Sequence, residues 1–247
     1  RDRSALIYAI VLRNEEIVDA LLEKNLEVNA VDKGGKSVLM YAVRLSNERI
    51  VSRLVEKGAK INAVDDEGKS ALIYAIRRGD RSIVMRLMEE DADIRTVDNK
   101  GKSVLMYLLE RFERDNKVCN IIQYVAERMV AQVGDARAED KDGRTLLMYA
   151  CASGCTYVVK KIIGKLDQNK YEDYSYINAV DMEGCTALGM AFSKGHKDVA
   201  EYLIKEGIMN PGTIENKDDF GKLVKDVNSR RNQQEIRRIE GREGIAM

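Results

Sequence analysis

The sequence has almost no proline, with Pro211 as its one example in 247 residues, and it has no tryptophan. Because proline interrupts helix interiors and central strands, its scarcity is compatible with a mostly helical chain. Histidine is equally scarce, since His196 is the only one. A catalytic site built on a histidine base would therefore have to use His196.

An excess of one charge is also missing, because 41 Lys and Arg residues balance 41 Asp and Glu residues. A neutral chain has no global field that would favour nucleic acid or an acidic membrane. No apolar run reaches the length of about 20 residues that spans a bilayer, and no secretory signal is visible. The four cysteines lack the spacing of a disulfide framework, which favours a reducing compartment. We therefore expect an intracellular, cytoplasmic protein without membrane contact.

What the sequence does contain is one phrase that recurs along most of its length. Its most regular copy is Gly68-Lys69-Ser70-Ala71-Leu72-Ile73-Tyr74-Ala75, and related copies begin at Gly35, Gly101, Gly143 and Gly184. An aspartate precedes each glycine by three residues, and successive aspartates are 33, 33, 42 and 41 residues apart: Asp32, Asp65, Asp98, Asp140 and Asp181. Self-similarity with this period predicts a solenoid, in which each unit contacts its neighbours.

The unit from Asp65 to Val97 predicts a turn followed by two helices. Residues 65–68 form the turn, in which Gly68 can adopt a positive φ. Ser70 can cap the first helix, whose apolar stripe runs from Leu72 to Ile76. A second stripe follows at Ile83, Val84, Leu87 and Met88. Two helices this short cannot bury these stripes alone, so the units must stack.

This unit resembles the ankyrin repeat. The family pattern runs Asp-x-x-Gly-x-Thr-Pro-Leu-His, then Ala-Ala, a Gly-His break, Ile-Val-x-x-Leu-Leu and a closing Gly-Ala-Asp-Val-Asn. The matching positions here are Asp65, Gly68, Ser70, Leu72, Ala75, Gly79, Ile83, Val84 and Leu87, and Gly58-Ala59-Lys60-Ile61-Asn62 matches the closing phrase. The resemblance implies an all-α solenoid of helix pairs joined by β-turn fingers. The family's histidine becomes isoleucine or methionine, so we expect apolar packing to replace its polar link.

On this resemblance we expect a single ankyrin-repeat domain at residues 1–240. About six repeats would lie at 1–31, 32–64, 65–97, 98–139, 140–180 and 181–217, followed by a capping half-repeat at 218–240 and a tail or vector remnant at 241–247. Insertions at residues 110–117 and 164–176 form either binding loops or tolerated surface length. Residues 218–222 are expected to restart the turn, and the polar residues after them to cap the array.

The sequence contains no recognisable catalytic, metal or cofactor site. His196 occupies the family's Gly-His break, where the resemblance implies a structural role, and Cys155 holds the same place one unit earlier. Neighbouring units stack about 8–10 Å apart. Zinc ligands lie about 2.0–2.3 Å from the metal, so this pair alone makes no site. No phosphate-binding glycine loop is present. We therefore expect no enzyme, no metal and no cofactor.

A partner-binding face follows from the helical spacing. Tyr74 lies outside the buried stripe and shares a face with Arg77 and Arg78. The resemblance implies that fingers and one side of each first helix form the concave surface. The predicted partner-binding residues are Tyr8, Tyr41, Tyr74, Tyr107 and Tyr149, with Arg44, Arg77, Arg78 and Arg111 beside them and Lys36, Lys69, Lys102 and Arg144 on the fingers. Alternatively, the tyrosines pack between units with solvated hydroxyls, and the lysines are ordinary solvated charges.

The leading hypothesis is a monomeric protein–protein interaction module that captures an acidic or phosphorylated segment of a partner, because tyrosine and arginine are favoured at interface hot spots. The alternative is a sensor that binds a nucleotide or oligonucleotide through tyrosine stacking and basic contacts to phosphate. A third possibility is a purely structural spacer, which only the regularity of the array supports.

Overall fold

The computed structural model of the chain describes residues 4–24, 28–112, 119–130, 136–166, 171–208, 210–212, 214 and 217–243. The chain divides into two compact units, Arg1–Met129 (unit 1) and Val130–Met247 (unit 2). Across these described ranges the regular structure is helical, and extended residues pair only in isolated bridges. The prediction of an all-α repeat fold is confirmed.

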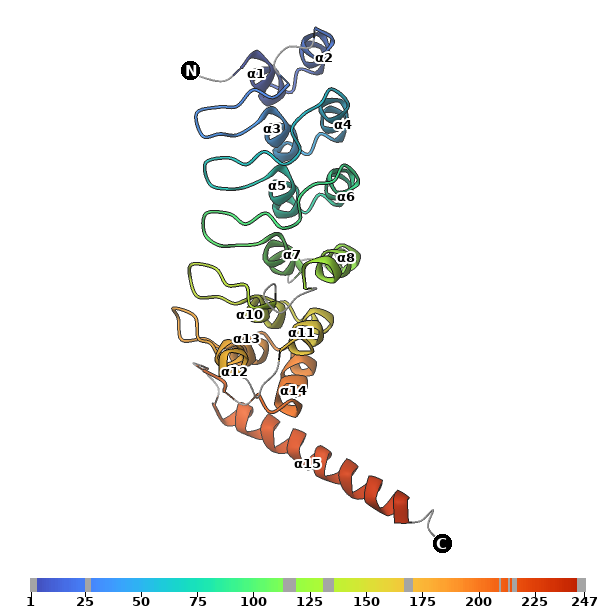
Figure 1. Cartoon of the computed structure of the whole chain (residues 1–247), viewed down its shortest axis with the longest axis vertical. Helices are drawn as coiled ribbons and strands as arrows, with labels where there is room; N and C mark the ends of the chain where they lie inside the picture. The colour runs from blue at the N-terminus through green and yellow to red at the C-terminus, as the bar shows by residue number, and fades with distance from the viewer. Residues whose placement is uncertain are drawn as a thin grey trace. The chain divides into compact units, whose positions relative to one another are not determined.

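Unit 1 contains helices in pairs, arranged as two rows (Figure 1). The first helices α1, α3, α5 and α7 pack on one another in sequence order, and α2, α4 and α6 form the second row. The pairs are α1 (Ala5–Val11) with α2 (Glu15–Glu23), α3 (Val38–Arg44) with α4 (Glu48–Glu56), α5 (Ala71–Arg78) with α6 (Arg81–Glu89), and α7 (Val104–Phe112) with α8 (Cys119–Met129).

Within its described residues, unit 2 continues the pattern with two further pairs and two additional helices. These are α10 (Leu146–Ala152), α11 (Thr156–Ile163), α12 (Tyr171–Ile177), α13 (Ala187–Ser193), α14 (Lys197–Lys205) and α15 (Lys217–Glu243). Helix α10 packs on α13, and α14 contacts both α11 and α15. Helix α12 lies in the predicted second insertion, so this insertion is partly helical. The first insertion extends α7 to Phe112, and residues 113–118 lie outside the described residues.

The first helices begin where the sequence places a small hydroxyl residue. The side chains of Ser37, Ser70 and Thr145 accept hydrogen bonds from the backbone N–H groups of Met40, Ile73 and Met148. Ser4 and Thr186 cap α1 and α13 in the same way. Each cap satisfies one backbone donor that the first helical turn cannot pair internally. The repeated Ser/Thr thus determines where each first helix starts.

Methionine at the family's histidine position keeps part of the polar link that we expected to be lost. The buried Sδ atoms of Met40 and Met148 accept hydrogen bonds of 3.4 Å from the backbone N–H groups of Ser37 and Thr145. Met106 makes the same contact with Ser103 at 3.5 Å. Thioether sulfur is a weak acceptor, so this bond supplements apolar packing. The methionines therefore supply the apolar packing that we expected, and only the expected loss of the polar link is wrong.

The fingers depend on their glycines for two reasons. Gly68 has φ 76°, a backbone conformation that costs other residues energy. A Cβ atom at Gly68 would also lie 2.9 Å from the backbone nitrogen of Asn99 in the next finger. This close approach allows Asn99 N–H to donate to Glu67 C=O at 2.9 Å. Adjacent fingers are therefore linked through their backbones.

The apolar stripes predicted from the sequence form the core of each pair. Leu72, Ile73 and Ile76 of α5 are buried, as are Ile83 and Leu87 of α6. Their equivalents in α3, α4, α10, α13 and α14 are also buried. Among the described helices, none is long and apolar enough to cross a membrane.

The C-terminal segment differs from the prediction. Residues 218–222 do not restart a turn, because the single helix α15 runs through them and includes Gly221. Asp218 and Asp219 lie in its first turn, where carboxylates interact favourably with the helix dipole. Phe220 packs edge-to-face on Phe192 at 5.4 Å, and Val227 is fully buried. Because residues 217–227 are helical, these apolar side chains can pack against the rest of unit 2.

Candidate functional site

The repeated tyrosines are mostly buried and bonded to the fingers. Tyr41, Tyr74 and Tyr107 are only 5–7% exposed. Their hydroxyls donate to the Oδ2 atoms of Asp32, Asp65 and Asp98 at 2.7, 2.6 and 2.6 Å. Tyr149 donates to Asp140 at 2.8 Å in the same way. The interpretation of these hydroxyls as solvated is therefore wrong, because each one ties a first helix to its own finger.

The surroundings of Tyr74 and Asp65 favour a protonated tyrosine and an ionised aspartate. Burial raises the pKa of Tyr74, and its hydrogen bond to the Asp65 carboxylate raises that pKa further. Burial alone would raise the pKa of Asp65, but bonds from the Tyr74 hydroxyl and from the backbone N–H groups of Lys69 and Glu67 outweigh it and lower that pKa. The tyrosine thus remains a donor and the aspartate remains an acceptor. Sequence reasoning missed this pair, although the spacing of nine residues recurs four times.

The fifth finger lacks this tyrosine, and an arginine replaces it. Met190 holds the position, and Asp181 Oδ2 instead accepts a 3.0 Å bond from Arg144 Nε. Arg144 also bonds Glu183 at 3.0 Å.

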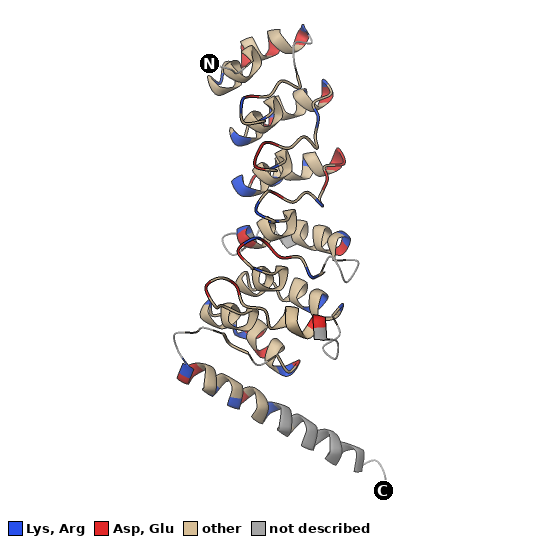
Figure 2. Ribbon diagram, turned by 60° about the vertical axis from the view of Figure 1, so that its left-hand side comes forward, with Lys and Arg blue, Asp and Glu red and all other residues tan. Residues whose placement is uncertain are grey.

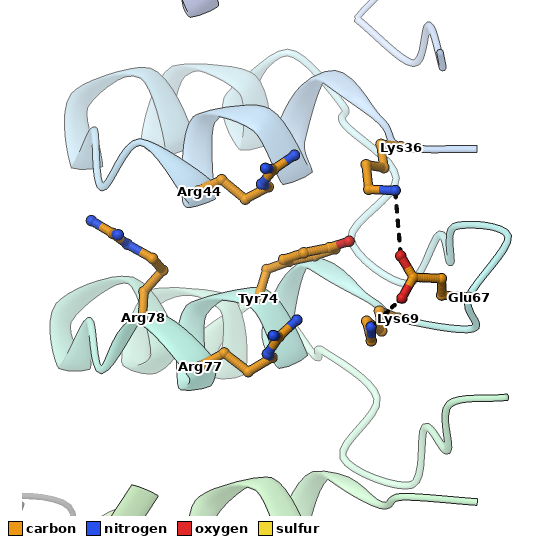
Figure 3. A pocket seen from close by; sticks show the side chains of 7 residues that line it. All are labelled: Lys36, Arg44, Glu67, Lys69, Tyr74, Arg77 and Arg78. Atoms are coloured by element: carbon orange, nitrogen blue, oxygen red, sulfur yellow. Dashed lines mark hydrogen bonds and ion pairs between the residues drawn. The ribbon is translucent and has the colours of Figure 1, made fainter. Parts of the chain in front are cut away.

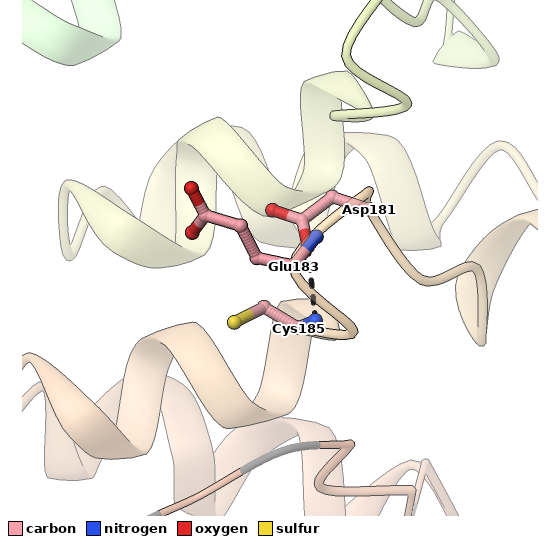
Figure 4. Close-up of side chains that lie close together, drawn as sticks. All are labelled: Asp181, Glu183 and Cys185. Atoms are coloured by element: carbon pink, nitrogen blue, oxygen red, sulfur yellow. Dashed lines mark hydrogen bonds between the residues drawn. The ribbon is translucent and has the colours of Figure 1, made fainter.

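The same finger brings three possible metal ligands together: the donor atoms of Asp181, Glu183 and Cys185 lie within 4.8 Å of one another (Figure 4). Arg144 is already ion-paired with both carboxylates, and burial together with these carboxylates raises the pKa of the Cys185 thiol. This cluster is therefore a poor match for a cation.

The basic finger residues of unit 1 are paired with carboxylates of the protein. Lys36 lies 3.6 Å from Asp65 and 3.7 Å from Glu67, and Lys69 also bonds Glu67. Lys102 pairs with Glu110 at 2.9 Å. These lysines are predicted partner-binding residues, yet much of their charge is compensated internally.

Three of the predicted arginines line a cavity of about 550 Å³ in unit 1 (Figure 3). Arg44 reaches it from α3, and Arg77 and Arg78 reach it from α5. The remaining lining residues are Lys36, Glu67, Lys69 and Tyr74. The structure thus brings together six of the predicted partner-binding residues and adds Glu67, which sequence reasoning did not identify.

The charge of the cavity is strongly positive. Five cationic side chains line it, against the single carboxylate of Glu67. Arg44 lies 5.6 Å from the ring centroid of Tyr41 and 5.8 Å from that of Tyr74, within the range of a cation–π contact. The arginines accordingly colour the C-terminal ends of α3 and α5 blue (Figure 2). The cavity can therefore attract an anion although the whole chain has no net charge.

The other predicted residues do not line this cavity. Tyr8 is 43% exposed on α1, and the Tyr107 ring lies 4.7 Å from the Lys102 ammonium. Arg111 of α7 lies against Gly79, where a Cβ atom would overlap its guanidinium. Tyr149 and Arg144 belong to unit 2.

His196 has the structural role that the resemblance implies. Its ring lies against Gly154, and Nε2 is 3.0 Å from the carbonyl oxygen of Ala152. The contact links α14 to the end of α10 within unit 2, since His196 immediately precedes α14 and Ala152 ends α10.

Comparison with protein families identifies the repeat. The family model described as "Ankyrin repeats (3 copies)" matches residues 1–65 and 113–215, more than half of the chain. The chain belongs to the ankyrin-repeat family. Ankyrin repeats generally act as protein–protein interaction modules, and proteins built from them are typically scaffolds without enzymatic activity. Residues 66–112, between the matched stretches, contain α5, α6 and α7 and continue the same ankyrin architecture. No curated protein matches the chain.

Proposed function

We propose that this ankyrin array captures an anionic segment of a protein partner at the cavity between α3 and α5. One observation carries the proposal: Arg44, Arg77 and Arg78 line one hollow, and among the described residues Glu67 is the one carboxylate beside them (Figure 3). Glu67 is bonded to Lys69 and lies close to Lys36, which leaves the arginines for a ligand. Arginine suits this role because its planar guanidinium forms paired hydrogen bonds with carboxylate or phosphate.

The tyrosines support this surface mainly as buried side chains that are hydrogen-bonded to the fingers, and they expose little ring area to a partner. Tyr74 forms part of the cavity, but its ring is 7% exposed and its hydroxyl is bonded to Asp65. A nucleotide sensor would need an aromatic face on which a base could stack. The buried ring offers little such area, so the geometry favours a peptide over a nucleotide.

Binding of labelled peptides tests the proposal. A phosphoserine peptide and a glutamate peptide should bind, and a neutral peptide of the same length should not. Added salt should weaken binding, because it screens exposed charges. Reversing Arg44, Arg77 and Arg78 to Glu should reduce affinity at least about tenfold and flatten the salt dependence.

The matched control reverses Lys60, Arg81 and Arg95 to Glu. These residues are exposed, do not line the cavity, and change the net charge by the same amount. Equal weakening by both triple variants would mean that only net charge matters, which contradicts the proposal. A thermal-shift panel of nucleotides gives a separate comparison, since a tight ligand raises stability by mass action. A shift with nucleotides and no peptide binding would favour the sensor instead.

A further inference from the structure

Four arginines of unit 1 form a series along three consecutive first helices. Arg44 lies at the end of α3, Arg77 and Arg78 end α5, and Arg111 lies in the last turn of α7. Among the described residues, none of these four forms an ion pair with a carboxylate, whereas Lys36, Lys69, Lys102 and Arg144 all do. At these helix ends, several positive charges without a carboxylate partner in the described part of the chain therefore lie on neighbouring first helices.

The arginines are positioned by contacts that leave their charge available. The Arg44 guanidinium lies near two tyrosine rings, and Arg78 donates a hydrogen bond of 3.5 Å to the Ser46 hydroxyl. Arg111 lies against Gly79, the residue that follows Arg78, and within the described part of the chain its buried Nε has no hydrogen-bond partner. Such contacts reduce the side-chain entropy that a ligand would otherwise have to remove.

The spacing of the helices limits which ligand can contact the whole series. Adjacent packed helices lie about 8–10 Å apart. A polyproline II segment rises about 3.1 Å per residue with three residues per turn, so side chains three positions apart lie on one side about 9 Å apart. In a β-strand, side chains on one face are two or four positions apart, at about 7 or 13 Å. The polyproline II spacing fits the helix repeat, and the β spacing does not.

Charge favours phosphate over carboxylate as the anion. A phosphorylated serine carries a charge of about −1.5 to −2 and three acceptor oxygens, which suits several guanidinium groups at once. The cavity presents five cationic residues and one carboxylate, so a single carboxylate from a ligand would leave it strongly positive.

We infer that the ligand is an extended peptide with phosphorylated Ser or Thr side chains three residues apart. One phosphate binds at Arg44 and Arg77, and the second binds at Arg78 and Arg111. This inference rests on the proposed function, because it names the chemistry and spacing of the ligand for the same surface.

Fluorescence anisotropy with three proline-rich phosphoserine peptides tests the spacing. The peptides have equal length and carry two phosphoserines three residues apart, two adjacent phosphoserines, or one phosphoserine. The first peptide should bind at least about tenfold more tightly than either of the others, because both of its phosphates bind within one complex. Equal affinity of the two doubly phosphorylated peptides would overturn the inference and leave the proposed function intact.

The variant Arg111→Gln tests the second phosphate position without altering the first. It should reduce the affinity of the three-residue-spaced peptide to that of the single-phosphate peptide, and leave the single-phosphate peptide unchanged. The control is Arg81→Gln, at an exposed residue outside the cavity, and it should change neither affinity. An unaltered affinity in Arg111→Gln would overturn the second phosphate position. Failure of all phosphopeptides and glutamate peptides to bind would instead overturn the proposed function itself.

Discussion

At the scale of single residues, the aspartate of the finger stabilises both the finger and the helix that follows it. Asp65 Oδ1 accepts hydrogen bonds from the backbone N–H groups of Glu67 and Lys69, and Oδ2 accepts the Tyr74 hydroxyl. One carboxylate therefore shapes the finger and links it to the following helix. Because Asp65 is 5% exposed, water cannot replace a lost partner without rearrangement.

The first prediction concerns the tyrosine hydroxyl. Tyr74→Phe should lower the free energy of unfolding by about 1–3 kcal/mol, because it leaves a buried carboxylate oxygen without its donor. Urea denaturation would measure the change. Tyr8→Phe, at a 43% exposed position, is the control and should cost less than about 0.5 kcal/mol. A Tyr74→Phe protein as stable as the unmodified chain would show that the bond contributes little.

The second prediction concerns acid stability. The pKa of Asp65 is lowered in the fold from an ordinary value of 3.8, so the ionised form is favoured in the native state. The resulting stability is complete above that ordinary value and is lost as the pH falls through the lower native pKa. Asp65→Asn should therefore lose less stability than the unmodified chain between about pH 4 and pH 2. Urea midpoints across this range would measure it.

A matched substitution distinguishes this carboxylate from its neighbour. Asp66 is exposed and adjacent in sequence, and Asp66→Asn should keep the acid dependence of the unmodified chain. If both substitutions flatten the pH profile equally, the effect comes from charge density in the finger and not from the buried aspartate.

At the scale of elements, the finger is the part of the repeat most sensitive to geometry. Gly35 and Gly68 both have positive φ, and the next finger approaches each of them closely. Gly58 also has a positive φ of 80°, but no atom lies within 4 Å of the Cβ that a side chain would add there. These glycines therefore separate the cost of backbone conformation from the cost of close approach.

The third prediction uses this difference. Gly58→Ala should destabilise unit 1 by about 1–2 kcal/mol, the cost of a left-handed conformation for a residue with a Cβ. Gly68→Ala should cost at least about 1 kcal/mol more, because its Cβ would meet the backbone of Asp98 and Asn99 at 2.9–3.1 Å. Denaturant titration would measure both. Equal costs would mean that the neighbouring finger moves aside freely.

At the scale of the whole molecule, each unit has its own core. In a repeat protein, stability is a sum of terms within each repeat and terms between neighbouring repeats. A destabilising substitution in one repeat therefore also affects the repeats next to it. Ile73 of unit 1 and Leu188 of unit 2 are both fully buried in first helices. They are therefore equivalent places at which to introduce a cavity into each unit.

The fourth prediction concerns the range over which such damage acts. Ile73→Ala should cost about 2–5 kcal/mol and accelerate amide hydrogen exchange mainly in α3, α5 and α7. Leu188→Ala should accelerate exchange mainly in α10, α13 and α14. Hydrogen exchange read by mass spectrometry would compare the two. Uniform acceleration along the whole chain in both variants would show that the molecule unfolds as one cooperative body.

The sequence by itself determined the repeat, the helix pairs and the family. Ser70 at the helix start, Gly68 in the turn and the stripe from Leu72 to Ile76 are local signals, each explained within one repeat. The C-terminal segment shows the limit of such signals. Its Asp218 to Lys222 stretch has turn composition, yet it is helical because Phe220 and Val227 pack on unit 2.

Only the tertiary structure decided which of the predicted site residues carry available charge. The sequence placed the lysines on the fingers and most of the arginines on the first helices of one predicted surface, but it did not show which of them pair with carboxylates. The close approach of neighbouring fingers brings Lys36 to Glu67, whereas no carboxylate reaches Arg77 from the described residues. The physical reason is that an ion pair depends on distances of a few ångströms between different repeats, which sequence spacing does not specify.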